Sequence, residues 1–382
     1  YTSVLQTPIL LLGSLIILVL GFKELGGWDE MMRVCGAVTV NDYGDTMTNL
    51  IRSNDDANFP WLGALIGSAI IGFWYWCTDQ FIVQRVLSGK NEMEARRGTI
   101  FGAYLKLLPV FLFLIPGMIA FALHQKYIGA GGEGFLPMLA NGTANADAAF
   151  PTLVAKLLPA GVKGLVVCGI LAALMSSLAS LFNSSAMLFT IDFYKRFKPE
   201  TPEKKLVGIG QIATIVIVVL GILWIPIMRS VGDVLYTYLQ DVQSVLAPGI
   251  AAAFLLGICW KRTSAQGGMW GLISGMVIGL TRLGAKVYYS NAGEVADSTF
   301  KYLFYDMNWL FFCGWMFLFC IIVVIVVSLA TEAPTAEKIQ GLVFGTATKE
   351  QKAATRASWN HWDIIHTVII LAITAAFYWY FW

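Results

Sequence analysis

Charged residues are scarce in this sequence, and their scarcity excludes an ordinary soluble domain. Only 13% of the 382 residues are Asp, Glu, Lys or Arg, whereas soluble domains carry roughly 25%. Hydrophobic residues make up 57% of the chain, and the mean hydropathy is +0.67. Apolar runs of about 20 residues, long enough to cross a bilayer as a helix, recur from end to end. Because these runs are continuous and do not alternate as barrel strands do, we expect an all-α membrane protein.

The sequence also lacks the residue patterns of metal sites, redox centres and nucleic-acid-binding surfaces. The three histidines are scattered, and the six cysteines show no metal-binding or redox spacing, so we expect no zinc site or histidine-based catalytic cluster. The net charge of +2 provides no basic surface for a nucleic acid. We find no low-complexity tract and no inserted soluble module. The chain opens with Tyr1 directly in an apolar run, so we expect that it lacks its natural beginning.

The apolar runs predict nine membrane spans. Their approximate bounds are 4–25, 60–86, 99–124, 162–194, 205–228, 231–258, 267–286, 307–331 and 361–382. Basic connections alternate with long or acidic ones, and because Lys and Arg concentrate on the cytoplasmic side, the first span should begin inside. We therefore expect a multi-pass protein of the cell membrane, plasma or inner.

Polar groups interrupt the span at 60–86. At helical spacing one stripe carries Gly72, Trp76, Gln80 and Gln84. Tyr75 and Asp79 share the adjacent stripe. Aromatic rings beside amide and carboxylate groups suit a polyhydroxylated ligand, because a ring covers the apolar face of a sugar. The alternative is an aromatic belt at the cytoplasmic interface, with Arg85 reaching the lipid headgroups.

Two more polar insertions predict groups that face a cavity, since ionisable side chains in a span are costly. Lys106 precedes Pro109 and Pro116 in one span, so this helix should bend or open locally. Its ammonium group either needs a buried partner or reaches the inner surface. In the span 231–258, polar side chains precede an expected helix break: Gln240, Asp241 and Gln243, followed by Pro248 and Gly249. Broken helices with polar residues at their centre are typical of transporter binding sites.

A serine-rich stretch occupies the span 162–194. Four of its residues step along one face: Ala173, Ser177, Ser180 and Ser184. Ser176 and Asn183 lie alongside. Small residues on one face allow close helix packing. Hydroxyls and exposed carbonyls equally suit Na⁺, a hard ion that prefers oxygen ligands.

Four of these segments resemble, in order and spacing, the sodium/solute symporter family and most of all its sodium-glucose cotransporter branch. The segments read WYWCTDQFIVQRVLSGKN, GAYLKLLPVFLFLIPGMI, AALMSSLASLFNSSAMLFTIDFY and AAAFLLGICWKRTSAQGGMWGL. The resemblance implies an inverted-repeat helix bundle with fourteen spans, of which about nine are present. Residues 1–382 would form a single transmembrane domain, from the fifth core helix of the fold to its last helix.

The resemblance also implies roles for individual residues. Tyr75 corresponds to an inner-gate tyrosine that stacks on the sugar, and Trp76 is its neighbour at that gate. Lys106 and Gln240 correspond to side chains that hydrogen-bond sugar hydroxyls. The sodium site would take a carbonyl and two hydroxyls from Ala173, Ser176 and Ser177.

The sequence departs from the family pattern in three places. We do not find the first core helix, which supplies further sodium ligands and sugar contacts. Ser3 stands where relatives have an Asp associated with sodium leaving toward the cytoplasm. Gly72 stands where several relatives have a polar residue that contacts the sugar. These departures leave the preferred sugar open.

The sequence therefore predicts a sodium-coupled symporter of a sugar such as glucose or galactose, working by alternating access. Its partners would be the sugar, Na⁺ and the lipid bilayer, with no nucleic acid and an open oligomeric state. We expect no enzyme activity, because no nucleophile and base occur together. The alternatives are a sodium symporter of another small solute (an inositol, a sialic acid or an amino acid), or a membrane sensor or channel.

Overall fold

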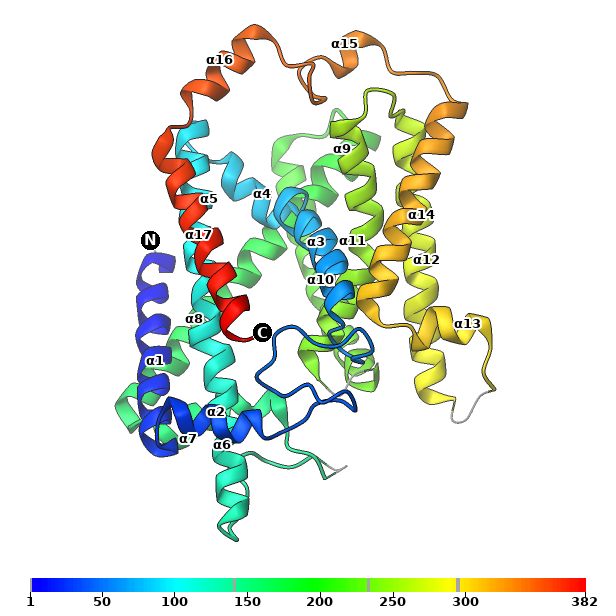
Figure 1. Ribbon diagram of the computed structural model, residues 1–382. Helices are drawn as coiled ribbons and strands as arrows, with labels where there is room; N and C mark the ends of the chain where they lie inside the picture. Colours follow the sequence, from blue (N-terminus) through cyan, green and yellow to red (C-terminus); the bar gives the residue numbers. More distant parts are fainter. Residues whose placement is uncertain (1, 140–141, 232–233, 293–295) are drawn as a thin grey trace. The chain divides into compact units, whose positions relative to one another are not determined.

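The structure is a computed structural model that describes residues 2–139, 142–231, 234–292 and 296–382 (Figure 1). Over this part of the chain 77% of residues are helical, and strand-type pairing is limited to isolated bridges. The prediction of an all-α protein is confirmed.

Seven helical segments of the described chain are long and apolar enough to cross a membrane. They are Thr7–Leu25, Glu92–Gly129, Ala160–Phe197, Glu203–Pro226, Leu235–Cys259, Trp309–Ala330 and His361–Tyr380. A bent pair, Trp61–Cys77 with Gln80–Leu87, makes an eighth if it counts as one span. The ninth predicted span, 267–286, forms helix α12 (Ala265–Asn291). Its glycines and two cations make it less apolar than the other spans.

The chain divides into two compact units, which we describe separately. The first unit contains Tyr1–Leu50, Phe101–Leu223 and Ile373–Trp382, and the second contains Ile51–Ile100 and Trp224–Ala372. The sequence interpretation expected a single transmembrane domain over 1–382, and that expectation stays a prediction.

The first unit is built around α1 (Thr2–Leu25), α2 (Trp28–Gly36), α6 (Ile115–Gly129), α7 (Ala149–Leu157) and α8 (Ala160–Met187). Its buried core takes Ile17, Met31, Ile119, Leu153 and Val166 from these five helices. Two glycines let α1 approach its neighbours, because a Cβ on Gly21 would lie 2.9 Å from Ile119 and one on Gly13 would overlap Val166. The unit also contains η2 (Ala146–Ala148), η3 (Leu188–Tyr194), α9 (Lys195–Phe197) and most of α10 (Glu203–Val231).

A π-helical segment opens the span that contains Lys106. Helix α5 (Glu92–Pro109) runs into η1 (Val110–Leu114) before α6 begins at Ile115. Pro109 and Pro116 flank this segment and carry no N–H, so the ordinary ladder of hydrogen bonds cannot continue through it. The predicted local opening of this helix is confirmed.

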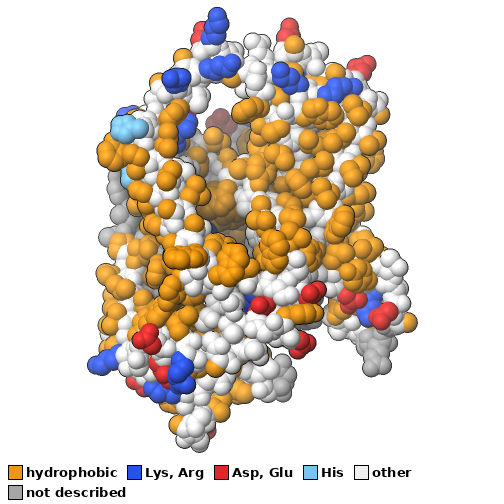
Figure 2. All heavy atoms as spheres, in the orientation of Figure 1, with side chains coloured by type: hydrophobic (Ala, Val, Ile, Leu, Met, Phe, Trp, Pro, Cys, Tyr) orange, Lys and Arg blue, Asp and Glu red, His pale blue; other side chains and the backbone are white. Residues whose placement is uncertain are grey.

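The second unit is built on three mutually packed helices, α11 (Leu235–Cys259), α12 and α14 (Trp309–Ala330), which lie side by side in Figure 1. Helix α3 (Trp61–Cys77) packs against α11 and α14. The unit also contains α4 (Gln80–Leu87), α13 (Thr299–Lys301), η4 (Tyr302–Asp306), α15 (Ala336–Ile339), α16 (Lys349–Ala357) and the larger part of α17 (His361–Tyr380). Figure 2 shows apolar side chains covering the visible face over α14.

A stripe of glycines on α12 brings the three helices of the second unit together. We call Gly267, Gly271, Gly275 and Gly279 the glycine stripe, and all four are buried. A Cβ on Gly275 would lie 2.9 Å from the Cα of Gly249 on α11 and 3.2 Å from Cys320 Sγ on α14. Small residues at a spacing of four let helix backbones touch, which is a common way to join helices in membranes.

Helix α11 continues through Pro248 and Gly249, where the sequence interpretation expected a break. Pro248 removes one backbone donor. Both residues are buried, and Gly249 lies against the glycine stripe. The close packing against α12 holds the helix together at this point, so the expected break is wrong.

The predicted span 60–86 is broken after Cys77, contrary to the continuous helix that the sequence interpretation assumed. Helices α3 and α4 meet at a bend of 49°. The Thr78 hydroxyl donates to the Trp74 carbonyl at 2.7 Å, and the Asp79 carboxylate accepts the Phe81 N–H at 3.0 Å as the N-cap of α4. The predicted polar stripe does not continue across this bend, because Gln80 and Gln84 belong to a new helix with its own direction.

We predict that Gly275→Ala destabilises the protein by about 1–3 kcal/mol, because its methyl group meets the backbone of Gly249. Gly284→Ala is the matched control on the same helix, since nothing lies within 4 Å of its Cβ position. Alanine should there be neutral or stabilising by up to about 1 kcal/mol. Thermal unfolding of both variants in detergent tests this, and equal melting temperatures would contradict the close approach.

We predict that Asp79→Ala loosens the start of α4, because it removes the N-cap and costs about 1 kcal/mol. Amide hydrogen exchange over 78–87 should accelerate several-fold. Asp79→Ser keeps a capping oxygen and should exchange like the unsubstituted protein. Unchanged exchange in the alanine variant would show that the bend does not depend on this cap.

Candidate functional site

The last turn of α3 carries a cluster of aromatic rings. The ring centroids of Tyr75 and Trp76 lie 5.3 Å apart at an angle of 89°, and Trp74 lies 6.3 Å from Tyr75. Tyr75 is half-buried, whereas 48% of Trp76 is exposed. The bend at Asp79 follows at once, so these rings stand at the end of a helix. An aromatic surface of this kind can cover the apolar face of a ring-shaped ligand.

Gln240 lies in the first turns of α11, in the same unit. Its side chain is half-buried, and its amide Nε2 donates to the Tyr236 hydroxyl at 3.3 Å. The amide oxygen is the group that can accept from a ligand hydroxyl.

The packing of α3 on α11 places Tyr75 and Gln240 at different levels of the second unit. Phe73 contacts Phe254 with ring centroids 6.0 Å apart, so the end of α3 lies beside the second half of α11. Gln240 precedes Phe254 by fourteen residues, which at 1.5 Å per residue corresponds to about 20 Å along the helix. The structure therefore does not bring these two predicted contacts to one level.

Lys106 and the predicted sodium residues belong to the first unit. Lys106 is exposed on α5, one turn before the π-helical segment. Ala173 and Ser176 are half-buried on α8, and Ser177 is exposed. The predicted residues thus fall into two sets: Tyr75, Trp76 and Gln240 in the second unit, and Lys106, Ala173, Ser176 and Ser177 in the first.

Part of the small-residue face of α8 packs against α1. A Cβ on Gly169 would lie 3.0 Å from Ile9, and Val166 meets Gly13. Ala173, Ser176 and Ser177 continue this face one to two turns further along the helix. The Ser184 hydroxyl donates to the Ser180 carbonyl at 2.9 Å and is satisfied within the helix. Helix packing therefore accounts for the beginning of this face.

Among the described residues, no group of three or more His, Cys, Asp or Glu side chains could hold a metal ion. The side chain of Ser3 lies outside the described residues, so the departure predicted there stays a prediction.

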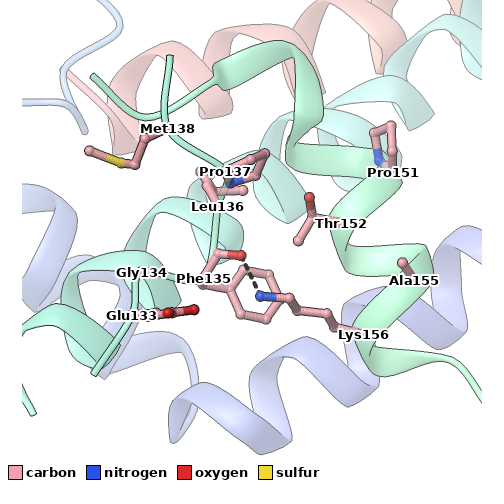
Figure 3. A pocket seen from close by; sticks show the side chains of 10 residues that line it. All are labelled: Glu133, Gly134, Phe135, Leu136, Pro137, Met138, Pro151, Thr152, Ala155 and Lys156. Atoms are coloured by element: carbon pink, nitrogen blue, oxygen red, sulfur yellow. Dashed lines mark hydrogen bonds between the residues drawn. The ribbon is translucent and has the colours of Figure 1, made fainter. Parts of the chain in front are cut away.

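A pocket of about 740 Å³ lies elsewhere in the first unit (Figure 3). Lys156 on α7 crosses it, with its ammonium group donating to the Phe135 carbonyl at 2.8 Å and lying 4.7 Å from the centre of the Phe135 ring. Thr152 lines the same pocket one turn earlier on α7. None of the predicted site residues contributes to it. The sequence interpretation treated 125–160 only as a polar connection and missed it.

The sequence interpretation also missed one buried and one half-buried cation of the second unit. It singled out Asp241 but not its two partners on α12. The guanidinium group of Arg282 lies 3.5 Å from the Asp241 carboxylate, and the ammonium group of Lys286 is hydrogen-bonded to it. The signal was available, since these are the two cations inside the predicted span 267–286.

Comparisons with known proteins identify the family of this chain. A family model, the sodium:solute symporter family, matches residues 1–275. The sodium/mannose cotransporter SLC5A10 of Bos taurus is 34% identical over 402 residues, covering 100% of this chain and 67% of the relative. The sodium/myo-inositol cotransporter 2 of Homo sapiens is 35% identical over 357 residues, covering 91% and 53%. The sodium/glucose cotransporter 1 of Ovis aries is 37% identical over 348 residues, covering 87% and 52%.

The chain spans about half the length of the human and ovine relatives and two thirds of the bovine one. All three relatives are named as cotransporters, which supports the expectation that the chain is not an enzyme. With its apolar helices, the chain is a multi-pass protein of the cell membrane. It belongs to the sodium:solute symporter family.

Proposed function

We propose that the protein is a sodium-coupled symporter that carries a sugar such as glucose or galactose by alternating access. The observation that carries this proposal is the match along 87–100% of the chain to sodium cotransporters of mannose, myo-inositol and glucose. All three solutes are rings that carry several hydroxyls. The myo-inositol relative makes a cyclic polyol the second candidate substrate.

Tyr75 and Trp76 are the proposed aromatic contacts of the sugar at the inner gate. The perpendicular arrangement of their rings leaves aromatic surface at the end of α3, just before the bend. A ring stacked on a sugar face is favourable because the C–H groups of the sugar leave water.

Lys106 and Gln240 are the proposed hydrogen-bonding contacts of the sugar hydroxyls. Each offers donors, and Gln240 also offers an acceptor. Gln240 and Tyr75 lie at different heights along α11. We therefore propose that these two residues line a path that the sugar follows. Lys106 of the first unit would contact the sugar through its ammonium group, which is costly when it faces lipid.

Na⁺ is the proposed co-substrate, and Ala173, Ser176 and Ser177 would supply part of its shell. One carbonyl and two hydroxyls are neutral oxygen ligands, which suit Na⁺ when further oxygens complete the coordination. Binding of Na⁺ that favours the sugar-competent state must be matched by tighter Na⁺ binding in the presence of sugar, because linkage is reciprocal. The Na⁺ gradient then drives the sugar inward.

We predict sodium-dependent uptake of one or more sugars from a panel of glucose, galactose, mannose and myo-inositol by the complete transporter in proteoliposomes. Replacing Na⁺ by K⁺ should abolish it.

Tyr75→Ala should reduce uptake at low sugar concentration about tenfold or more, because the stacking surface is lost, whereas Tyr75→Phe should retain most of it. Unchanged uptake by the alanine variant would remove Tyr75 from the sugar path.

We predict that Ser177→Ala raises the Na⁺ concentration for half-maximal sugar uptake several-fold, because one oxygen ligand is lost. The apparent sugar affinity at fixed Na⁺ should fall with it. Ser185→Ala, on the same helix but outside the predicted set, is the matched control and should leave the Na⁺ curve unchanged. If the curves of the two variants superimpose on that of the unsubstituted protein, Ser177 serves helix packing instead.

A further inference from the structure

A cluster of three charged side chains, two buried and one half-buried, lies in the second unit and includes Asp241, the residue after Gln240. We call Asp241, Arg282 and Lys286 the charge cluster. Asp241 is 5% exposed and Arg282 is fully buried. The Asp241 carboxylate lies 3.5 Å from the Arg282 guanidinium through Oδ1, and its Oδ2 accepts a hydrogen bond from the Lys286 ammonium group. The cluster joins α11 to two successive turns of α12.

Arg282 is fixed independently of Asp241. Its guanidinium donates to the carbonyls of Leu303 at 3.3 Å and Met307 at 2.7 Å, at the two ends of η4. Its Cζ lies 4.1 Å from the centre of the Phe312 ring on α14. The glycine stripe ends at Gly279, one turn before Arg282, so the backbone of α12 is also held close to α11 here. Arg282 is therefore held in place by contacts with η4 and α14.

Asp241 ties α11 to these two cations of α12. It is the one charged residue of that helix, so no other ionic contact sets the rotation of α11 about its axis. A carboxylate deprived of its cations in a buried place is costly, and the helix must keep Asp241 turned toward α12. Successive residues of a helix differ by about 100° in direction, so this choice also fixes the direction of Gln240.

Gln240 precedes Asp241 on α11, so its side chain leaves the helix about 100° away from that of Asp241. It is half-buried, and it bonds Tyr236 one turn earlier on the same helix. That single neutral hydrogen bond, from Gln240 to an exposed tyrosine on the same helix, cannot by itself fix the rotation of α11.

We propose that Asp241 is a positioning residue for sugar binding, which aims Gln240 into the sugar path through its ion pairs with Arg282 and Lys286. This inference rests on the proposed sugar contact of Gln240. The competing explanation is that the cluster only stabilises the fold. A purely stabilising ion pair would change the number of folded copies in the membrane, whereas a positioning residue changes the KM for the sugar at a given number of copies.

The experiment measures sugar uptake at saturating Na⁺ by the complete transporter in proteoliposomes, normalised to the inserted copies. Asp241→Ala should raise the sugar KM about tenfold, as expected for one lost or misdirected hydrogen bond. The maximal rate per copy should stay within about twofold. Gln240→Ala should raise KM by a similar factor. The double variant should raise KM no further than Gln240→Ala alone, because Asp241 acts through Gln240.

Asp297→Asn is the matched control in the same unit. It also removes a carboxylate from an ion pair, with Lys301 Nζ 2.8 Å away, but its side chain is 95% exposed. The hydrogen bond from Lys301 lowers the pKa of Asp297, so the control removes a charge as the test variant does. Its sugar KM should be unchanged.

Any one of four results would overturn the inference. A multiplicative KM effect in the double variant would mean that Asp241 acts on its own, and fewer copies with an unchanged KM would leave only a structural role. An unchanged KM in Gln240→Ala would refute the proposed sugar contact as well, whereas a raised KM in Gln240→Ala alone would refute only the positioning role. If Asp241→Ala does not insert, Asp241→Asn decides, with an expected rise in KM of about threefold.

Discussion

The close approach of α12 to α11 and α14 is the constraint on which the second unit depends. The glycine stripe lets backbones touch, with a Cβ on Gly275 only 2.9 Å from Gly249 on the neighbouring helix. In lipid this contact gains little from water exclusion, so dispersion contacts and interhelical polar bonds must hold the helices. The stripe explains why α11 remains helical through Pro248, and it ends where Arg282 and Lys286 meet Asp241.

The polar groups of the chain are consequently arranged on rigid supports and at helix irregularities. Tyr75 and Trp76 stand before the bend between α3 and α4, and Lys106 stands before the π-helical segment that Pro109 and Pro116 flank. Irregular backbone at such places frees carbonyl groups and redirects side chains, as transporters require. We thus propose that neighbouring packing sets the directions of the groups along the sugar path. For Gln240 the contacts extend from Asp241 to Arg282 and Lys286 on α12.

Much of the fold followed from hydropathy, because long apolar runs in a bilayer have few alternatives to a helix. Eight predicted spans coincide with helices that are apolar enough to cross a membrane when the bent pair counts as one, and the ninth forms α12. The prolines predicted the opened helix after Lys106. The bend at Asp79 was not predictable in this way, because no glycine or proline marks it and it depends on two side-chain bonds. The partners of Asp241 required a contact between residues about forty apart in sequence. The candidate site came from resemblance, and its division between two units was not visible in any local pattern.

Coupled accumulation is the measurement that tests the central claim most directly. Proteoliposomes containing the complete transporter are prepared with no sugar inside. An inward Na⁺ gradient is then imposed, with labelled sugar at low concentration outside. The account predicts that the internal sugar concentration rises transiently above the external one, and that a Na⁺ ionophore removes this overshoot, because only the ion gradient can drive sugar uphill. Equilibration of the sugar to equal concentrations with the Na⁺ gradient intact would contradict coupled symport and indicate a passive pathway.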